Sequence, residues 1–253
     1  MIVLGFDTAT QATAVGLRLG DGTTLQASDD PAEGERPGHA TRLLGLARQL
    51  LDEAAVGWSE LERIAVGVGP GRFTGLRVGI ATARGLAQSL KSGVVGVSSL
   101  GALARPAGEH AEAVLAVIDA RRGEVFAAAY LAGQESTPAG AVAPGALKDL
   151  TAVAAGPWLA VGDGAVRYRT YLEGAGIEVP DAGSGLHTIA GAAVCELGAA
   201  SEAQALEAVL PDYRRRPDAE VALERVAVPV AAATFAGVPV PGAPAGAPRE
   251  GGR

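Results

Sequence analysis

The chain has little of several residue types, and each scarcity limits what it can be. Its single cysteine, Cys195, excludes an internal disulfide and fits a reducing compartment, so we expect a cytoplasmic protein. Aromatic residues make up only 4% of the sequence, so the core must depend on close backbone approach at its many glycines and alanines. With 253 residues, 48% of them hydrophobic, one large domain or two small ones can form.

Histidine is also scarce, and no two histidines have the H-x-x-x-H spacing of a metal site. The sequence therefore gives no reason to assign a metal ligand or a catalytic residue. Residues 1–7 are typical of a buried first strand and not of a signal peptide. The longest apolar run, 226–240, is interrupted by prolines, which argues against a membrane-spanning helix.

Acidic residues are missing from one stretch of an otherwise acidic chain. Between Arg63 and Gly108 there is no aspartate or glutamate but there are six basic residues, in a protein of net charge -7. A local basic region of this kind indicates a site for something anionic. The pI near 5.1 nevertheless argues against strong tRNA or DNA binding by the isolated chain, because phosphate contacts dominate such affinity.

The most informative segment, Gly67–Gly79, lies inside this basic stretch and contains five glycines. It separates a predicted strand from a predicted helix, so its backbone N–H groups can approach a ligand or partner closely. The segment lacks the lysine of a P-loop, and the third glycine and acid of a dinucleotide-binding loop. Gly75, Gly79 and Ala83 recur every four residues, which permits close packing of a helix within the chain or against a partner.

Hydrophobic periodicity predicts the secondary structure. Strands are predicted at 2–6, 13–19, 23–27, 64–68 and 94–97, and helices at 39–55, 74–90 and 188–199. Thr74 is the predicted N-cap of the second helix, and Ser98 or Ser99 that of a short helix after the last strand. Strands followed by helices in this order predict a mixed sheet flanked by helices.

The pattern of the first strand then returns. Val114–Asp119 matches Ile2–Asp7 at an offset of 112 residues, and each segment ends in an aspartate followed by a small polar turn. We therefore predict an α/β protein with an N-terminal lobe at 1–107 and a related C-terminal lobe at 108–216. An extension at 217–253 follows, and its Gly/Pro-rich part from about 237 is predicted to be disordered.

The aspartates at the two equivalent strand ends are candidates for nucleotide binding. Asp7 and Thr8 in the first lobe, with Asp119 in the second, could position Mg²⁺ and phosphate oxygens. This arrangement favours an autonomous ATPase or kinase as one alternative function. Asp and Thr are also ordinary turn residues, and no acid is placed as an evident general base beside a second substrate.

A peptidase is a further alternative. Gly96–Leu100 approaches the G-x-S-x-G motif of a nucleophile elbow but has leucine at its last position. The candidate residues are Ser98 and Ser99 together with His39, His110 and His187, which only the fold could bring together.

Several blocks of the chain resemble the bacterial TsaB family, also called YeaZ. They occur in the family's order over about 1–216, and the most specific is Gly69–Gly79. The other blocks are Leu4–Thr10, Val95–Leu100, Ile118–Glu124, Val161–Gly164 and Leu210–Arg214. One departure is Arg72, where the family usually has serine. The resemblance implies the two-lobed actin/hexokinase-like (ASKHA) fold, built from duplicated ribonuclease H-like lobes.

The resemblance also implies a function. Family members act in tRNA modification, forming N6-threonylcarbamoyladenosine beside the anticodon of tRNAs that read ANN codons. The catalytic subunit is a paralogue, TsaD, with a metal-binding H-x-x-x-H where this chain has Ser99 and Leu103. Because neither side chain replaces a neutral imidazole, the resemblance implies a non-catalytic scaffold that activates TsaD.

The same resemblance implies the partners and the surface that meets them. The expected partners are TsaD, the ATPase TsaE and, through the complex, tRNA, with a homodimer when TsaD is absent. No cofactor is assigned to this chain, and ATP or ADP is expected at the interface of the complex. The helices at 39–55 and 74–90 are the expected contact, through the residues Leu43, Leu46, Leu50, Gly75, Leu76, Gly79, Ile80 and Ala83.

Overall fold

The computed structural model describes residues 1–32 and 35–214. The predicted extension at 217–253 and the apolar run at 226–240 lie outside the described residues. Within the described part, no helix is both long enough and apolar enough to span a membrane.

The first lobe is a five-stranded mixed sheet in the order β3-β2-β1-β4-β5. Its strands are β1 (Val3–Asp7), β2 (Thr13–Arg18), β3 (Thr24–Asp29), β4 (Arg63–Gly69) and β5 (Gly93–Ser98). β1, β2 and β3 form an antiparallel meander, and β4 and β5 continue the sheet parallel to β1. These bounds confirm the predicted strands. The prediction succeeded because each strand is a short apolar run bounded by turn residues.

The second lobe repeats this plan with a four-stranded sheet in the order β8-β7-β6-β9. Its strands are β6 (Ala113–Arg121), β7 (Glu124–Leu131), β8 (Gln134–Val142) and β9 (Leu159–Val161). The antiparallel meander of β6, β7 and β8 is again followed by one parallel strand, β9 beside β6. The 112-residue repeat is thus a structural duplication, with β1 equivalent to β6.

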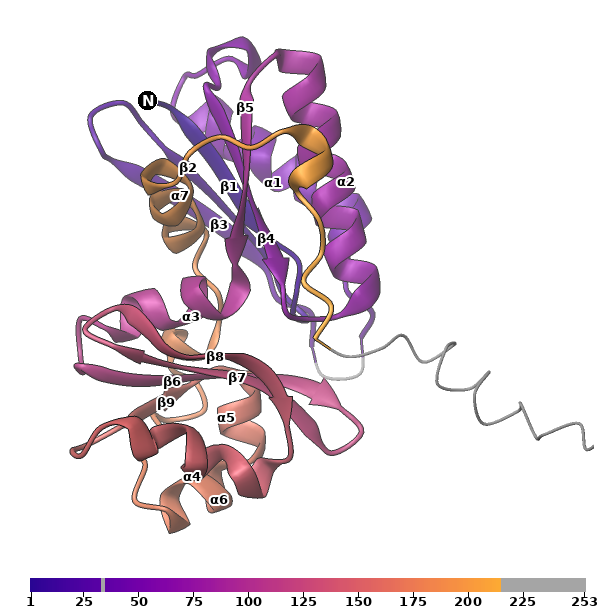
Figure 1. Cartoon of the computed structure of the whole chain (residues 1–253). Coiled ribbons are helices and arrows are strands. Elements are labelled where there is room, and N and C mark those ends of the chain that lie inside the picture. The colour runs from indigo at the N-terminus through magenta and orange to yellow at the C-terminus, as the bar shows by residue number, and fades with distance from the viewer. Residues whose placement is uncertain (33–34, 215–253) are drawn as a thin grey trace, which may run out of the picture. The chain divides into compact units, whose positions relative to one another are not determined.

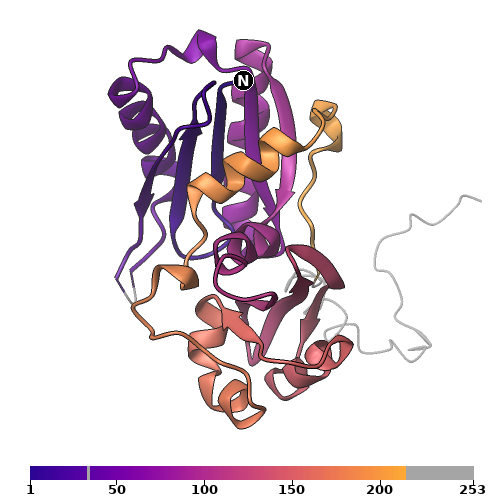
Figure 2. The ribbon, with the colours of Figure 1, turned by 90° about the vertical axis from the view of Figure 1, so that its left-hand side faces the viewer.

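Helices cover both faces of the first sheet. They are α1 (His39–Glu53) and α2 (Phe73–Leu90) on one face and α7 (Gly191–Ala200) on the other, as Figures 1 and 2 show. The alternation of the strands explains this, since Leu4 and Phe6 belong to the core with α1 and α2, and Val3 to the core with α7.

Two cores serve the second sheet. Its outer face packs on α4 (Leu147–Leu150), α5 (Asp163–Arg167) and α6 (Arg169–Gly174). Its inner face packs on α3 (Ser99–Ala107), which shares one continuous core with α7 and both sheets. This shared core joins the two lobes into one compact unit.

The position of α7 differs from the sequence prediction for the C-terminal lobe at 108–216. α7 packs against β1, β2 and β4 of the first sheet, and residues after it reach β5 through the pair Val94–Gln204. Glycines make this approach possible. A Cβ at Gly16 would lie 2.4 Å from the backbone of Gly191, and one at Gly5 would lie 2.8 Å from Cys195. Periodicity identifies a helix but not the sheet on which it packs.

Two predicted helix starts have different outcomes. Ser98 is the N-cap of α3, and its Oγ accepts a hydrogen bond from the N–H of Gly101 at 3.1 Å. The prediction for Thr74 is wrong, because α2 begins at Phe73 and its N-cap is Arg72, which provides no side-chain cap. The N–H of Arg72 donates to the carbonyl of Ala9 at 2.7 Å, so the backbone fixes where this helix starts.

Candidate functional site

The candidate site begins where β1, β4 and β5 end, at Asp7, the glycine loop and Ser99. Ser99 Oγ donates to Asp7 Oδ2 at 2.5 Å and accepts a hydrogen bond from the N–H of Gly69 at 3.1 Å. A Cβ at Gly67 would lie 1.7 Å from the same carboxylate oxygen, so only glycine fits there. These contacts tie the three strand ends to one another.

Asp7 is committed to this network on both of its oxygens. Its Oδ1 accepts the N–H of Ala9 at 2.7 Å, and the residue is only 1% exposed. Burial raises the pKa of Asp7 above its ordinary value of 3.8, while the hydrogen bonds from Ser99 and Ala9 oppose that shift. In this structure Asp7 therefore organises the loop, and does not face a solvated cleft as a Mg²⁺ ligand would.

The raised pKa of Asp7 predicts a change in pH dependence. Because the native state then binds more protons than the unfolded state above pH 3.8, the contribution of Asp7 to stability falls as pH rises toward the folded-state pKa. We expect Asp7→Asn, which cannot ionise, to lose less stability than the wild type between pH 4 and pH 7. Urea unfolding at a series of pH values measures this, and parallel curves for the two proteins would contradict the assignment.

Thr8 and the glycines of α2 are also committed to packing inside the chain. Thr8 Oγ1 donates to the carbonyl of Gly75 at 2.8 Å, and Thr8 is fully buried. A Cβ at Gly75 would lie 2.0 Å from the Thr8 carbonyl oxygen, and one at Gly79 would lie 2.4 Å from Thr8 Oγ1. The predicted small-residue spacing of α2 thus serves close packing on the turn after β1.

The predicted partner surface needs a correction. Every residue proposed for it is buried within the chain, because the apolar stripes of α1 and α2 face their own sheet. The residues concerned are Leu43, Leu46, Leu50, Gly75, Leu76, Gly79, Ile80 and Ala83. If these helices meet a partner, they do so through their outward faces.

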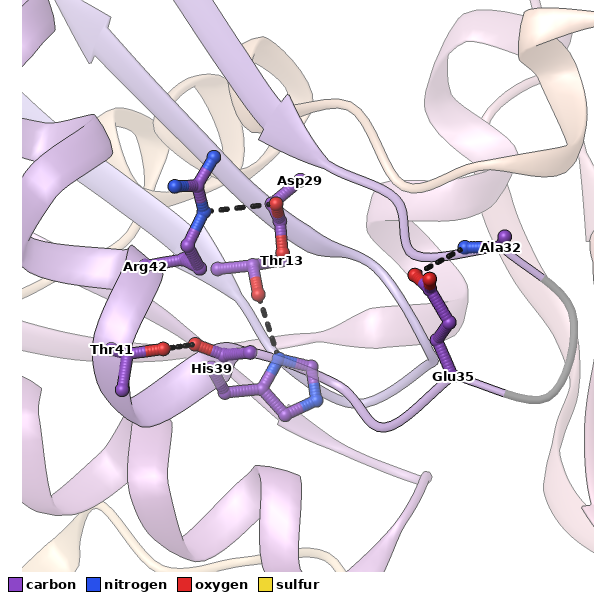
Figure 3. Close-up of polar contacts among 8 residues, drawn as sticks. Thr13, Asp29, Ala32, Glu35, His39, Thr41 and Arg42 are labelled. Atoms are coloured by element: carbon purple, nitrogen blue, oxygen red, sulfur yellow. Dashed lines mark hydrogen bonds and ion pairs between the residues drawn. The ribbon is translucent and has the colours of Figure 1, made fainter.

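Figure 3 shows how the start of α1 is held. His39 Nδ1 lies 2.8 Å from Thr13 Oγ1, and Arg42 Nε lies 2.9 Å from Asp29 Oδ1. Burial lowers the pKa of His39, and the charge of Arg72 lowers it further, so the ring is neutral near pH 7. These contacts fasten the helix to β2 and β3.

The residues of the peptidase alternative do not assemble. Ser98 caps α3, Ser99 bonds Asp7 and Gly69, and neither hydroxyl contacts a histidine within residues 1–32 and 35–214. His187 is structural, since its Nδ1 accepts the N–H of Gly162 at 3.1 Å.

The equivalent aspartate of the second lobe has different surroundings. Asp119 Oδ2 lies 3.7 Å from Arg121 Nε and 3.8 Å from Arg167, and its N–H donates to Asp163 Oδ1 at 2.9 Å. Burial raises the pKa of Asp163, and the positive charge of Arg72 opposes this shift. Arg72 of the glycine loop is therefore close enough for its charge to act on the aspartates of the second lobe. Asp163 lies in the block Val161–Gly164 that resembles the family, but it was not among the candidate site residues.

The positions that correspond to a metal-binding H-x-x-x-H in the resembled paralogue are used for packing. Ser99 bonds Asp7, and Leu103 is 2% exposed in the core shared by the two lobes. No group of three histidine, cysteine or acidic side chains lies together as a metal site in the described part of the chain.

Two lobes of one plan, each with an aspartate near the end of its central strand, define the actin/hexokinase-like class with duplicated ribonuclease H-like lobes.

The TsaD family, described as tRNA N6-adenosine threonylcarbamoyltransferase, matches residues 33–160. The "tRNA threonylcarbamoyladenosine biosynthesis protein TsaB" of Escherichia coli is 36% identical over 172 residues, which are 65% of this chain and 72% of that protein.

Other relatives agree. The protein of the same name from Haemophilus influenzae is 36% identical over 129 residues, so the match spans about half of each chain, 50% of this one and 52% of that one. The solved structure "YeaZ from Pseudomonas aeruginosa" is 31% identical, has a TM-score of 0.69, and is covered over 100% of its length by 84% of this chain. A second structure from that organism, described as similar to "peptidase YEAZ", also has a TM-score of 0.69 at 33% identity, over 85% of this chain and 99% of that one. The chain belongs to the TsaB (YeaZ) family.

Proposed function

We propose that this chain is a non-catalytic subunit in the formation of N6-threonylcarbamoyladenosine in tRNA, where it binds and activates a catalytic subunit of the TsaD family. The names of its E. coli and H. influenzae relatives support the pathway. Binding to TsaD and the activating role are the parts of this proposal that require an experiment.

The observation that carries the proposal is a pair of glycines on the outward faces of α1 and α2. Gly45 and Gly85 are exposed in helix interiors, and a Cβ at either would meet no atom within 4 Å among residues 1–32 and 35–214. Each costs its helix about 1 kcal/mol relative to alanine, and nothing in this described part of the chain requires either one. Glycine on a helix surface permits a partner helix to approach closely.

The surroundings of these glycines suit such a contact. α1 and α2 pack side by side on one face of the sheet, so their outward faces adjoin. Leu44, beside Gly45, is 49% exposed, and Ala81, one turn before Gly85, is also exposed. The sequence alone could have suggested this surface, since both glycines interrupt helices away from any turn.

Three side chains support a non-catalytic role. Ser99 and Leu103 stand where the paralogue carries histidines, and both are buried in packing or hydrogen bonds. Asp7, the residue best placed for Mg²⁺, has both oxygens occupied within the chain.

The wider assembly follows from the same proposal. TsaE and tRNA would join through the complex with TsaD, ATP or ADP would bind at its interface, and the outward faces of α1 and α2 would pair in a homodimer when TsaD is absent. Cytoplasmic localisation accompanies this role.

Direct titration tests the proposal. We expect the full chain to bind TsaD of the same organism as a one-to-one complex in calorimetry or analytical ultracentrifugation. Absence of binding at concentrations where both proteins are folded would overturn the proposed function, whatever the family assignment.

A further inference from the structure

An exposed aromatic and arginine cluster lies where the chain's last described residues meet the start of α2. The rings of Phe73 and Tyr213 stack with centroids 5.2 Å apart and an interplanar angle of 25°. The Arg77 guanidinium carbon lies 3.8 Å from the centre of the Phe73 ring, and Arg77 Nε donates to Tyr213 Oη at 2.8 Å. We call these three residues the aromatic cluster.

The segment that carries Tyr213 is fixed in place along the first sheet. In Figure 1 it runs from α7 past β5 and β4 toward the beginning of α2. The N–H of Gln204 donates to the carbonyl of Val94, and the N–H of Asp212 donates to the carbonyl of Val68, each at 2.8 Å. The aromatic cluster is thus a preformed surface, although Arg77 and Tyr213 are 136 residues apart in the chain.

The two rings of the cluster are exposed to solvent, although burying them would stabilise the fold. Phe73 and Tyr213 are each 40% exposed, in a protein with few aromatic residues to bury. Arg77 has no carboxylate within 4 Å among residues 1–32 and 35–214, so its charge is available. An exposed stacked pair of rings can bind a flat group, and a guanidinium without a carboxylate partner can bind an anionic one.

The neighbours of the cluster indicate which class of partner fits. Arg72 and Thr74 flank Phe73, and Arg214 follows Tyr213, paired with Asp212 at 2.6 Å. The surrounding stretch from Arg63 to Gly108 holds six bases and no acid. This rim is polar and mostly basic, and basic side chains beside exposed rings suit an anionic partner. Single-stranded RNA offers unstacked bases for the rings and phosphates for the arginines.

Resting on the proposed function, we propose that the aromatic cluster is the surface through which this subunit contacts unpaired nucleotides of the tRNA substrate. A base stacks on the exposed part of the Phe73–Tyr213 pair, and Arg77 faces the neighbouring phosphate. Because the chain as a whole is acidic, this contact adds to RNA binding by the complex and does not make the isolated chain a strong RNA binder.

The test uses the complex of this chain with TsaD and two RNA probes, unmodified tRNA and its isolated anticodon stem-loop. We expect Phe73→Ala to weaken binding of both RNAs by at least about fivefold, the loss of one base stack. We expect Arg77→Ala to weaken binding and to reduce the slope of log K against log salt by about 0.7, the value for one phosphate contact on a single strand. Phe73→Ala should leave that slope unchanged.

Matched controls come from the same chain. Tyr171→Ala removes a tyrosine that is 60% exposed in the second lobe, and Lys148→Ala removes an exposed basic residue of α4 in the same lobe. Neither should change RNA affinity. Thermal melting checks that all variants are folded.

Affinity for TsaD, measured without RNA, separates the possible failures. If Phe73→Ala and Arg77→Ala bind TsaD normally but bind RNA as the wild type does, the RNA contact is wrong and the proposed function stands. If they lose TsaD binding instead, the cluster belongs to the protein interface and the RNA assignment is overturned. If the wild type itself fails to bind TsaD, the proposed function fails.

Discussion

Replacing Gly45 and Gly85 together by glutamine is expected to weaken binding to TsaD by roughly thirtyfold or more while making the isolated chain more stable. A side chain inserted at each close helix contact costs about 1–3 kcal/mol, or about 2–6 kcal/mol for both. In the isolated chain both positions are exposed with open space around the Cβ, and glutamine is the better helix former. Titration against TsaD and urea unfolding of the free chain measure the two effects.

The opposite directions of these effects make the test specific. A variant that merely damages the fold loses stability and binding together, whereas this one should gain about 1 kcal/mol in stability. Gly174→Gln, at an exposed glycine of α6 in the second lobe, is the matched control and should bind TsaD normally. Normal binding by the double variant would show that the outward faces of α1 and α2 are not the contact.

Replacing Ile80 by aspartate is expected to destabilise the fold strongly, not simply to separate the chain from a partner. Ile80 is 5% exposed in the core between α2 and the first sheet, together with Val66 and Leu43. The substitution removes a buried aliphatic side chain and buries a charge without a partner, which we expect to cost more than about 4 kcal/mol. Because whole domains are stable by only about 5–15 kcal/mol, a loss of this size should move the midpoint of urea unfolding far below that of the wild type.

Ile80→Val is the control for this prediction, with an expected loss of about 1 kcal/mol. The alternative, that Ile80 lies on a partner surface, makes a different prediction: Ile80→Asp would melt like the wild type and fail only in TsaD binding. That result would contradict the burial found for α2.

Much of the fold could be predicted from the sequence because strands and helices follow hydrophobic periodicity. The strands at the start of the chain and the repeat beginning at Val114 needed no knowledge of long-range contacts. The place of α7 could not be predicted, because its helical pattern is the same whichever sheet it covers. The close approach of Gly16 to Gly191, and of Gly5 to Cys195, shows that it packs on the first sheet.

The site was harder to predict, and for a physical reason. A small-residue stripe such as Gly75 and Gly79 indicates that something packs closely, but spacing does not say whether the neighbour is Thr8 of the same chain or another protein. Burial decides between these, and it assigns the stripe to the core. The aromatic cluster joins residues 73 and 213, and no local sequence pattern predicts a contact over that distance in the chain.

We propose that this chain is required for tRNA modification without performing the chemistry, and a leave-one-out reconstitution tests this proposal. TsaD, TsaE, the adenylate-forming synthase, threonine, bicarbonate, ATP and unmodified tRNA are combined with and without this chain, and modified adenosine is counted. We expect product only when the chain is present, and none from the chain alone. Equal product without the chain would show that it is not required.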